Sequence, residues 1–310
     1  GKSPAPAVQP AGNTAAAQKT LPVFSADSAY HYIAQQLDFG PRVPGSAAQK
    51  NCAAWLNSEL TRHGAKVYEM HASAKAYDGT ELPIINLVGS FNTEAANRVL
   101  ILSHWDSRHI ADEDPVKENR TKPVPAANDG ASGVGVILEL ARLFQQQAPQ
   151  MGVDLFLTDA EDYGAPDNWP GQHREDWWAL GTQEWCKQPH VANYRATFGI
   201  LLDMVGAKDA TFYREFYSDR YASDIVNMVW QKAQQLGYGR YFINAQGGGI
   251  TDDHVFVNQM RRIPCIDIID TRQNSGGSFY PYWHTTDDTL DKISKETLQA
   301  VGDVLINILY

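Results

Sequence analysis

The sequence is most informative at Leu155-Phe-Leu-Thr-Asp-Ala-Glu161-Asp162-Tyr-Gly164. Its apolar first half is typical of a buried strand, and the Tyr-Gly pair after the acids is typical of a loop. Active sites of α/β sheets collect where strands end, outside the carboxyl edge. Two adjacent carboxylates there can divide the work, with one facing a metal and the other carrying protons. Acids also follow strands as plain solvated charge, so this interpretation depends on what lies at the other strand ends.

The rest of the chain alternates between strand-like and helix-like patterns. The patterns predict helices over residues 25–37, 46–60, 134–147, 178–187, 219–236 and 292–309, and strands over 66–70, 82–89, 98–103, 153–158, 198–203 and 263–269. Such alternation favours an α/β fold with three α/β/α layers, in which helices cover both faces of a mixed, mostly parallel central sheet. We expect one folded domain over residues 23–310. Residues 1–22, rich in Ala, Pro and Gln, are predicted to form a disordered N-terminal tether.

The composition excludes several classes of protein. Among 310 residues, 43% are hydrophobic and 20% charged, which is ordinary for a globular chain, and the net charge of −10 argues against a nucleic-acid partner. No apolar run approaches the roughly 18 residues that span a membrane. Three scattered cysteines, Cys52, Cys186 and Cys265, predict buried thiols rather than a disulfide framework. The tether suits a protein exported to the bacterial periplasm or envelope, with a lipid anchor upstream of residue 1 as one form of attachment.

Other chemically active side chains also follow predicted strands or begin helices. Together they form a set of nitrogen and oxygen ligands: His104, Asp129, Asp162, Asp203 and His284. Imidazole and carboxylate without thiolate suit a catalytic zinc that keeps an open position. Each residue also has a simpler interpretation, such as an N-cap for Asp129. Separate structural roles are a less convincing explanation for five such residues that all lie at strand ends of one sheet.

These residues carry a resemblance to the zinc aminopeptidase superfamily and, within it, to the bacterial glutaminyl cyclases (glutaminyl-peptide cyclotransferases). The resemblance covers about residues 25–310 and lies in six motifs: His104-Trp-Asp-Ser, Ala127-Asn-Asp129, Asp159-Ala-Glu161-Asp162, Leu202-Asp203, Asp252-Asp253-His254 and Trp283-His284-Thr. It implies the zinc aminopeptidase-like (phosphorylase/hydrolase-like) fold for a single catalytic domain. It also implies an acyltransferase that cyclises the N-terminal glutamine of peptides and proteins to pyroglutamate and releases ammonia. We expect the enzyme to be a monomer.

The resemblance assigns a role to each site residue. It implies that Asp129, Asp162 and His284 bind one zinc per chain, that Glu161 is the general acid/base, and that Asp203 and Asp252 form a hydrogen-bonded pair of acids beside the metal. Trp283 matches a wall of the substrate pocket, and Trp169 matches a second wall. His104 and Asp267 are expected either at a second metal or behind the residues that touch the first. Asp162 stands where many relatives have Glu, which calls for a closer approach of the backbone.

The chief alternative is a two-zinc aminopeptidase that hydrolyses N-terminal residues. In that interpretation Asp129 bridges two metals, His104 and Asp203 hold the second, and Glu161 activates a water. The number of ligands does not distinguish the aminopeptidase from the cyclase, because the sequence contains all five ligands that two metals would need. The additional acid in Asp252-Asp253-His254 and the Trp before His284 favour the cyclase. A third interpretation is a catalytically inactive binding protein on the same fold, against which the intact Glu161 argues.

Overall fold

The protein is described by a computed structural model that covers residues 20–273 and 278–310. The tether predicted over residues 1–22 therefore lies outside the described residues, except for its last three. The helices are α1 (Ala26–Asp38), α2 (Ala47–Arg62), α3 (Ala131–Gln146), α4 (Leu180–Lys187), α5 (Phe216–Gln235), α6 (Asp253–Phe256) and α7 (Lys295–Leu309). The strands are β1 (Lys66–Lys75), β2 (Glu81–Phe91), β3 (Arg98–His104), β4 (Gly152–Thr158), β5 (Phe198–Asp203), β6 (Phe212–Arg214), β7 (Phe242–Gln246) and β8 (Cys265–Ile269).

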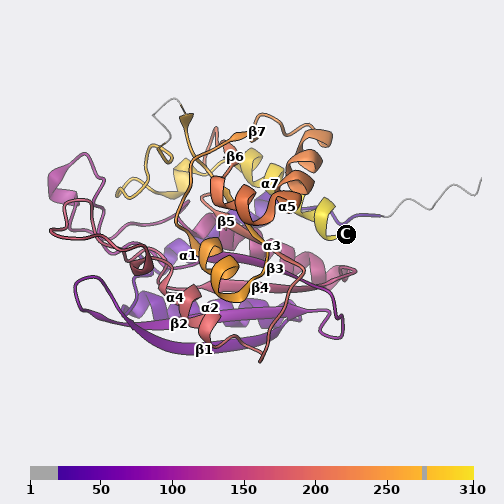
Figure 1. Ribbon diagram of the computed structural model, residues 1–310, viewed down its shortest axis with the longest axis horizontal. Coiled ribbons are helices and arrows are strands. Elements are labelled where there is room, and N and C mark those ends of the chain that lie inside the picture. Colours follow the sequence, from indigo (N-terminus) through magenta and orange to yellow (C-terminus); the bar gives the residue numbers. More distant parts are fainter. Residues whose placement is uncertain (1–19, 274–277) are drawn as a thin grey trace, which may run out of the picture.

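The main sheet has six strands in the order β1-β2-β4-β3-β5-β8 (Figure 1). Neighbours β4, β3, β5 and β8 run parallel, whereas β1 and β2 pair antiparallel with each other and β2 with β4. The predicted mixed, mostly parallel sheet is therefore confirmed. The sequence patterns did not reveal the short parallel pair β6 and β7, which forms a separate sheet.

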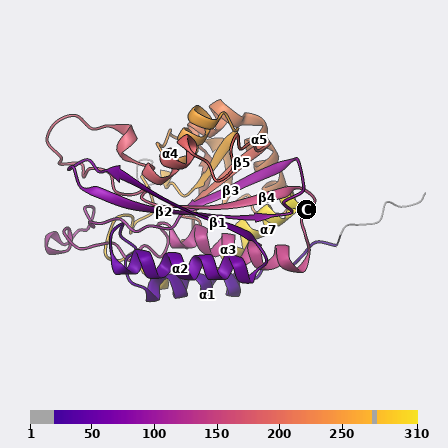
Figure 2. The same ribbon diagram turned by 90° about the horizontal axis from the view of Figure 1, so that it is seen from below.

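Helices cover both faces of the main sheet, as Figure 2 shows with α1, α2 and α3 on one side and α4 on the other. Strand β3 explains why: its residues point alternately to the two faces, and both sets are apolar. Val99 and Ile101 pack into the core cluster that includes residues of α1, α3 and α7, while Leu100 and Leu102 pack into the cluster with Trp185 of α4. Each such fully buried aliphatic side chain contributes roughly 1.5–3 kcal/mol of hydrophobic stabilisation.

Serine caps begin three of the helices. The hydroxyls of Ser25, Ser46 and Ser294 accept hydrogen bonds from the amides of Ser28, Gln49 and Thr297, respectively. This satisfies amides that have no partner within the helix. The prediction for α5 was less accurate, because this helix begins at Phe216 rather than residue 219. Its cap is Glu215, a residue type that sequence rules do not favour at this position.

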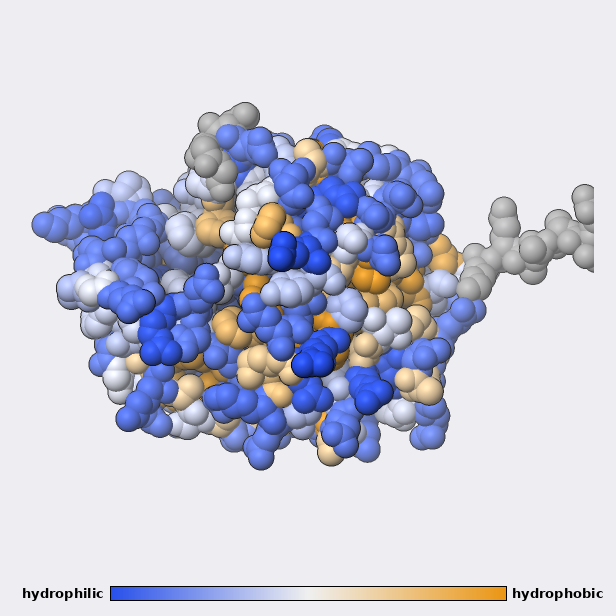
Figure 3. All heavy atoms as spheres, in the orientation of Figure 1, coloured by the Kyte–Doolittle hydropathy of each residue, from blue (hydrophilic) through white to orange (hydrophobic). Residues whose placement is uncertain are grey.

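The remaining general expectations concern the cysteines and the surface. All three cysteines are free and buried, as predicted. In the described part of the chain, no helix combines the length and the apolar character needed to cross a membrane. Figure 3 shows a largely hydrophilic face with small, separate hydrophobic patches.

Candidate active site

The carboxyl ends of the parallel strands bring the predicted site residues together. His104 ends β3, Glu161 and Asp162 follow β4, and Asp203 ends β5. The strand order reverses around β3, because β4 and β5 flank it on opposite sides, and such reversals create crevices at the carboxyl edge of a sheet. Asp129 comes from the segment that enters α3, and His284 comes from the loop that precedes α7.

Left-handed backbone conformations mark these junctions. Ala160, Met204 and His284 have φ values of 51°, 53° and 54°. Residues with a side chain rarely adopt this region, and they persist there where surrounding structure holds them, often at functional sites. Gly130 meets a different requirement: a Cβ there would lie 2.5 Å from the carbonyl oxygen of His104. Only glycine allows the chain after Asp129 to pass this close to the end of β3.

Asp129, Asp162 and His284, which we call the ligand triad, are buried with their ligand atoms within 4.8 Å of one another. His284 Nε2 lies 3.0 Å from a carboxylate oxygen of Asp162 and 3.3 Å from Oδ2 of Asp129. Tetrahedral zinc with bonds of about 2.0–2.1 Å would separate its ligand atoms by about 3.3 Å. The triad therefore fits zinc in both ligand type and spacing.

Histidines also determine the charge of Asp129. Burial alone would raise the pKa of Asp129, but hydrogen bonds with His104 and His284 hold this pKa well below its ordinary value. His104 Nε2 lies 2.8 Å from Asp129 Oδ1. Asp129 thus stays ionised, as a metal ligand must.

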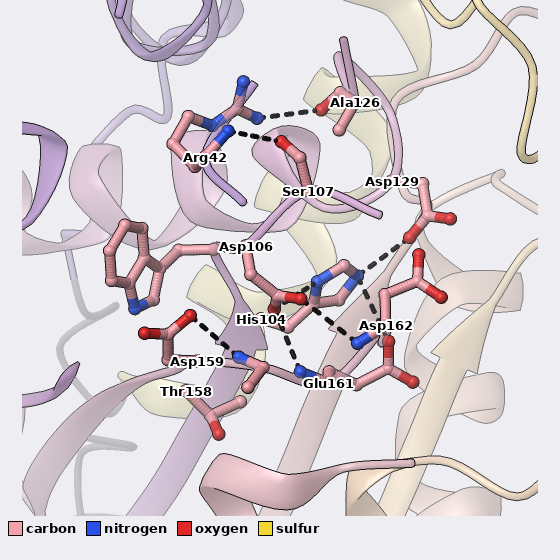
Figure 4. Close-up of polar contacts among 12 residues, drawn as sticks. Arg42, His104, Asp106, Ser107, Ala126, Asp129, Thr158, Asp159, Glu161 and Asp162 are labelled. Atoms are coloured by element: carbon pink, nitrogen blue, oxygen red, sulfur yellow. Dashed lines mark hydrogen bonds and ion pairs between the residues drawn. The ribbon is translucent and has the colours of Figure 1, made fainter. Parts of the chain in front are cut away.

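Two further carboxylates hold the ligand segments in place. The carboxylate of Asp288 accepts hydrogen bonds from the amides of Asn128 and Asp129, at 2.9 and 3.1 Å. Asp106 accepts hydrogen bonds from the amides of Glu161 and Asp162, each at 3.1 Å, and its Oδ1 lies 3.1 Å from His104 Nδ1 (Figure 4). Asp106 belongs to the motif His104-Trp-Asp-Ser, and Asp288 follows the motif Trp283-His284-Thr by three residues. The sequence interpretation assigned no role to either acid.

Arg108 is a second feature that the sequence interpretation missed. Its Nη1 donates hydrogen bonds to the carbonyl oxygens of Asp162 and Gly164, both at 3.0 Å. Its other guanidinium nitrogens bind the two carboxylate oxygens of Asp112, at 2.7 and 2.9 Å. The guanidinium also lies 5.1 Å from the ring centre of Trp178, within the range of a cation–π contact. One buried cation therefore links a ligand segment to an aromatic wall of the site.

A cavity of about 270 Å³ opens directly beside the triad. This is smaller than the roughly 300–1,000 Å³ of sites for drug-sized ligands, and it suits a single amino-acid side chain. Aromatic walls come from Trp178, Phe279 and Trp283, and the ring of Trp283 stacks on that of His284 with centres 3.9 Å apart. Trp283 therefore lies where it was predicted. Trp169 does not line this cavity and packs edge-on against Tyr77 with ring centres 4.9 Å apart, while Trp178 of the same loop supplies the wall.

Asp203, Asp252 and Asp267 form a second set of buried carboxylates near Glu161, which we call the acid group. Oxygen atoms of Glu161, Asp203 and Asp252 lie within 4.8 Å of one another, and Asp267 shares a similar cluster with Asp252 and His254. All three members of the acid group have buried oxygens without a hydrogen-bond partner among the described residues. Burial, reinforced by the charge of Asp252, raises the pKa values of Asp203 and Asp267 well above their ordinary range.

The residues expected at a second zinc are also close together. Ligand atoms of His104, Asp129 and Asp203 lie within 4.8 Å of one another, and His104 Nε2 is 3.6 Å from Asp203 Oδ1. The distances within this cluster and within the ligand triad are therefore compatible with one bound metal or with two. Asp267 belongs to neither cluster that contains Asp129, which places it behind Asp252 rather than at the zinc site.

Three solved structures are closely similar to this chain. The Zn-dependent exopeptidase from Parabacteroides distasonis is 52% identical, with a TM-score of 0.92 over 94% of this chain and 99% of that one. Glutaminyl cyclase from Bacteroides thetaiotaomicron, solved with N-acetylhistamine, is 47% identical, with a TM-score of 0.92 over 94% and 99% of the two chains. Glutaminyl cyclase from Tannerella forsythia is 52% identical, with a TM-score of 0.91 over 93% and 99%.

The sequence profile that matches the chain covers residues 86–309, which run from the second strand of the sheet to the last helix and include every residue of the ligand triad. This protein belongs to peptidase family M28.

Proposed function

We propose that the protein is a zinc-dependent glutaminyl cyclase that converts the N-terminal glutamine of peptides and proteins to pyroglutamate and releases ammonia. The observation that carries this proposal is the acid group: Glu161 lies near two further buried carboxylates, Asp203 and Asp252, beside a pocket for one side chain. A buried cluster of acids, in which burial raises the pKa values of Glu161 and Asp203, suits a reaction in which nitrogen groups gain and lose protons. Similarity to two bacterial glutaminyl cyclases at 47% and 52% identity supports the same function.

The reaction needs little beyond positioning and proton transfer. The α-amine of glutamine attacks the carbon of its own side-chain carboxamide, a carbon–nitrogen bond forms, and the bond to the amide nitrogen breaks. The proton lost by the amine is the one that the departing nitrogen needs to leave as ammonia. Because nucleophile and electrophile belong to one residue, the enzyme mainly has to hold the side chain folded back on itself.

Asp129, Asp162 and His284 would hold the metal. When bound, zinc supplies a Lewis acid for the carboxamide oxygen. His284 is fixed by the stacked ring of Trp283, and the backbone of Asp162 is fixed by Arg108 and Asp106. The chain thus holds its ligands in place through groups that are not themselves ligands, as metal sites commonly do.

Glu161 is the proton carrier in this proposal. Burial and the neighbouring charge of Asp162 raise the pKa of Glu161 well above its ordinary value, which makes its carboxyl group a better proton acceptor than an exposed one. It would accept the proton of the attacking amine and return it to the departing nitrogen. Asp203 and Asp252 lie close enough to accept hydrogen bonds from that nitrogen.

The cavity walls serve the same chemistry. Three aromatic side chains, together with Met204, Ile250 and Ile269, form the apolar part of the cavity wall, while carboxylates, Thr251 and His284 line most of the rest. Excluding water matters because a water molecule that replaced the amine as nucleophile would give glutamate instead of the ring. The apolar walls therefore favour cyclisation over hydrolysis.

A two-zinc aminopeptidase remains the second candidate, favoured by the cluster of His104, Asp129 and Asp203. The two functions release different products. We expect a Gln-initiated dipeptide to yield ammonia and a pyroglutamyl peptide, and a Leu-initiated dipeptide to remain intact. Release of free leucine at a rate comparable to or above that of ammonia would overturn the cyclase assignment.

A further inference from the structure

An exposed aromatic surface at the start of α5 adjoins the wall of the cavity. Phe216 and Tyr221 are 44% and 39% exposed, the two highest values for aromatic side chains in the described part of the chain. Tyr217 is partly buried, and it precedes Tyr221 by four residues, a spacing that places both on the same side of a helix. We call Phe216, Tyr217 and Tyr221 the α5 ridge.

Direct contacts join this ridge to the cavity wall. Gly249 lines the cavity, and a Cβ on Gly249 would lie only 2.9 Å from a ring carbon of Tyr217, so the ring packs directly against the backbone of the wall. The amide of Phe216 donates a hydrogen bond to the carbonyl oxygen of Gly248, at 3.2 Å. The rings of Phe216 and Tyr217 meet edge to face, with centres 5.4 Å apart.

The outer end of the ridge is also held in place. The hydroxyl of Tyr221 accepts a hydrogen bond from the side-chain amide of Gln259, at 3.0 Å. Gln259 belongs to the helical turn that follows α6, the short helix that carries His254. The ridge is therefore a fixed surface, attached at one end to the cavity wall and at the other to the segment after Asp252.

The lining of the cavity includes both the reacting centre and the backbone next to the ridge. Glu161, Asp203 and Asp252 line it, and so does Gly249. Tyr217 packs against Gly249, so the wall at this glycine continues directly into the ridge. With the first residue of a peptide in the cavity, the next three residues of an extended chain span about 10 Å, which is the scale of a few side chains on a protein surface. Exposed aromatic rings contribute binding energy to apolar groups and much less to short uncharged polar groups such as those of Ser and Asn.

We propose that the α5 ridge binds apolar side chains at the second to fourth positions of the substrate peptide. The enzyme would then select among Gln-initiated chains by the residues that follow glutamine, while the cavity selects glutamine itself. This inference rests on the proposed function, because it takes the first residue of the peptide to occupy the cavity.

The test compares three probes, the dipeptide Gln-Ala and the tetrapeptides Gln-Ala-Leu-Phe and Gln-Ala-Ser-Asn, with ammonia release as the readout. For the unaltered protein we expect kcat/KM to be about tenfold higher for the apolar tetrapeptide than for the polar one. The double variant Phe216→Ser, Tyr221→Ser should bring the two tetrapeptides within about twofold of each other and leave the dipeptide unchanged. A matched control is Leu236→Ser, because Leu236 is 37% exposed and follows the last residue of α5, at the opposite end from the ridge.

Each outcome bears on one claim only. Equal kcat/KM for both tetrapeptides in the unaltered protein, or a preference that survives the double variant, would overturn the ridge as a peptide site. A change of sedimentation mass in the double variant without a change of preference would overturn it too, because the ridge would then join copies of this chain. If no Gln-initiated probe releases ammonia, the proposed function fails instead.

Discussion

The two groups of buried carboxylates around Glu161 differ in how their charges are balanced. In the ligand triad, Asp129 lies within hydrogen-bond distance of two histidines, and Asp162 lies beside His284 with Arg108 4.0 Å from its Oδ1. In the acid group, oxygens of Asp203, Asp252 and Asp267 have no hydrogen-bond partner among the described residues. The pKa of Asp129 is lowered, with hydrogen bonds outweighing burial, whereas burial raises the pKa of Asp203 well above its ordinary value and that of Asp162, in the triad, to about 6.

This difference indicates what each group can bind. A buried carboxylate without a cation or hydrogen-bond donor is costly, so it either meets a cation or keeps a proton. The triad is surrounded by nitrogen groups within hydrogen-bond distance, and its ligand types suit zinc. The nitrogens nearest to the free oxygens of the acid group are farther away, with His104 Nε2 3.6 Å from Asp203 Oδ1 and His254 Nδ1 3.5 Å from Asp267 Oδ2, so protons can balance this group. We infer that the triad is built to hold a metal and the acid group to hold protons.

The largest expected effect comes from removing a triad ligand. His284→Ala should release zinc and lower kcat/KM by on the order of 10³-fold, because the Lewis acid is lost together with its ligand. Zinc content after dialysis and ammonia release measure the two effects, and circular dichroism checks the fold. His71→Ala, on a side chain that is 64% exposed, is the control. Full activity of a zinc-free His284→Ala protein would contradict the role of the triad.

Glu161→Gln separates proton transfer from metal binding. It should lower kcat by about 10²- to 10⁴-fold, the usual contribution of a general acid/base, with zinc content unchanged. Elemental analysis and ammonia release report the two properties, and the exposed acid in Glu175→Gln serves as the control. Loss of zinc in Glu161→Gln would place this residue among the ligands instead.

Arg108→Met tests how the ligand segment is supported. The variant removes the hydrogen bonds to the carbonyls of Asp162 and Gly164 and the ion pair with Asp112, and methionine fills much of the same volume. Zinc affinity, measured by competition with a chelator, should fall by about 10- to 100-fold, as it does for supporting residues of other metal sites. An unchanged zinc affinity would mean that Asp106 alone positions the segment.

Asp267→Asn should have the smallest effect, confined to pH dependence. A carboxyl group whose pKa is raised on folding stabilises the fold at pH values below its unfolded pKa, near the ordinary value of 3.8, and this contribution is lost as the pH rises toward the folded pKa. Asn mimics the protonated form, so the variant should gain stability relative to the unaltered protein as the pH rises above the unfolded pKa. Urea unfolding with zinc in excess measures this difference, and the exposed Asp224→Asn provides the control. A variant that is equally or less stable at about pH 8 would mean that folding does not raise the pKa of Asp267.

The sequence predicted the site residues better than their surroundings. His104, Asp203 and Glu161 follow apolar strands, and the carboxyl ends of parallel strands meet at one edge, so their proximity follows from the strand pattern alone. Arg108 and Trp178 lie in long loops, and the contacts of a loop depend on tertiary packing that local patterns do not record. Several of their partners are far away in the chain, as Trp178 and Asp162 are from Arg108.

Two of the three tryptophans in the loop after Glu161 show this limit most clearly. Trp169 and Trp178 both follow Glu161, and no periodic pattern separates them. In the structure the two rings have different neighbours. Tyr77, in the turn between β1 and β2, contacts the ring of Trp169, and Arg108 lies over the ring of Trp178. Likewise, the acids Asp106 and Asp288 were visible in the sequence, but their roles depend on amides that only the folded backbone brings within reach.

The most direct test of the division between metal and protons is the zinc content of Asp203→Asn beside that of the unaltered protein. If the acid group holds protons, both proteins should bind about one zinc per chain, because three protein ligands suffice for one catalytic zinc. If Asp203 is a metal ligand, the unaltered protein should bind two metals and the variant one. That second result would contradict the division and favour the aminopeptidase interpretation.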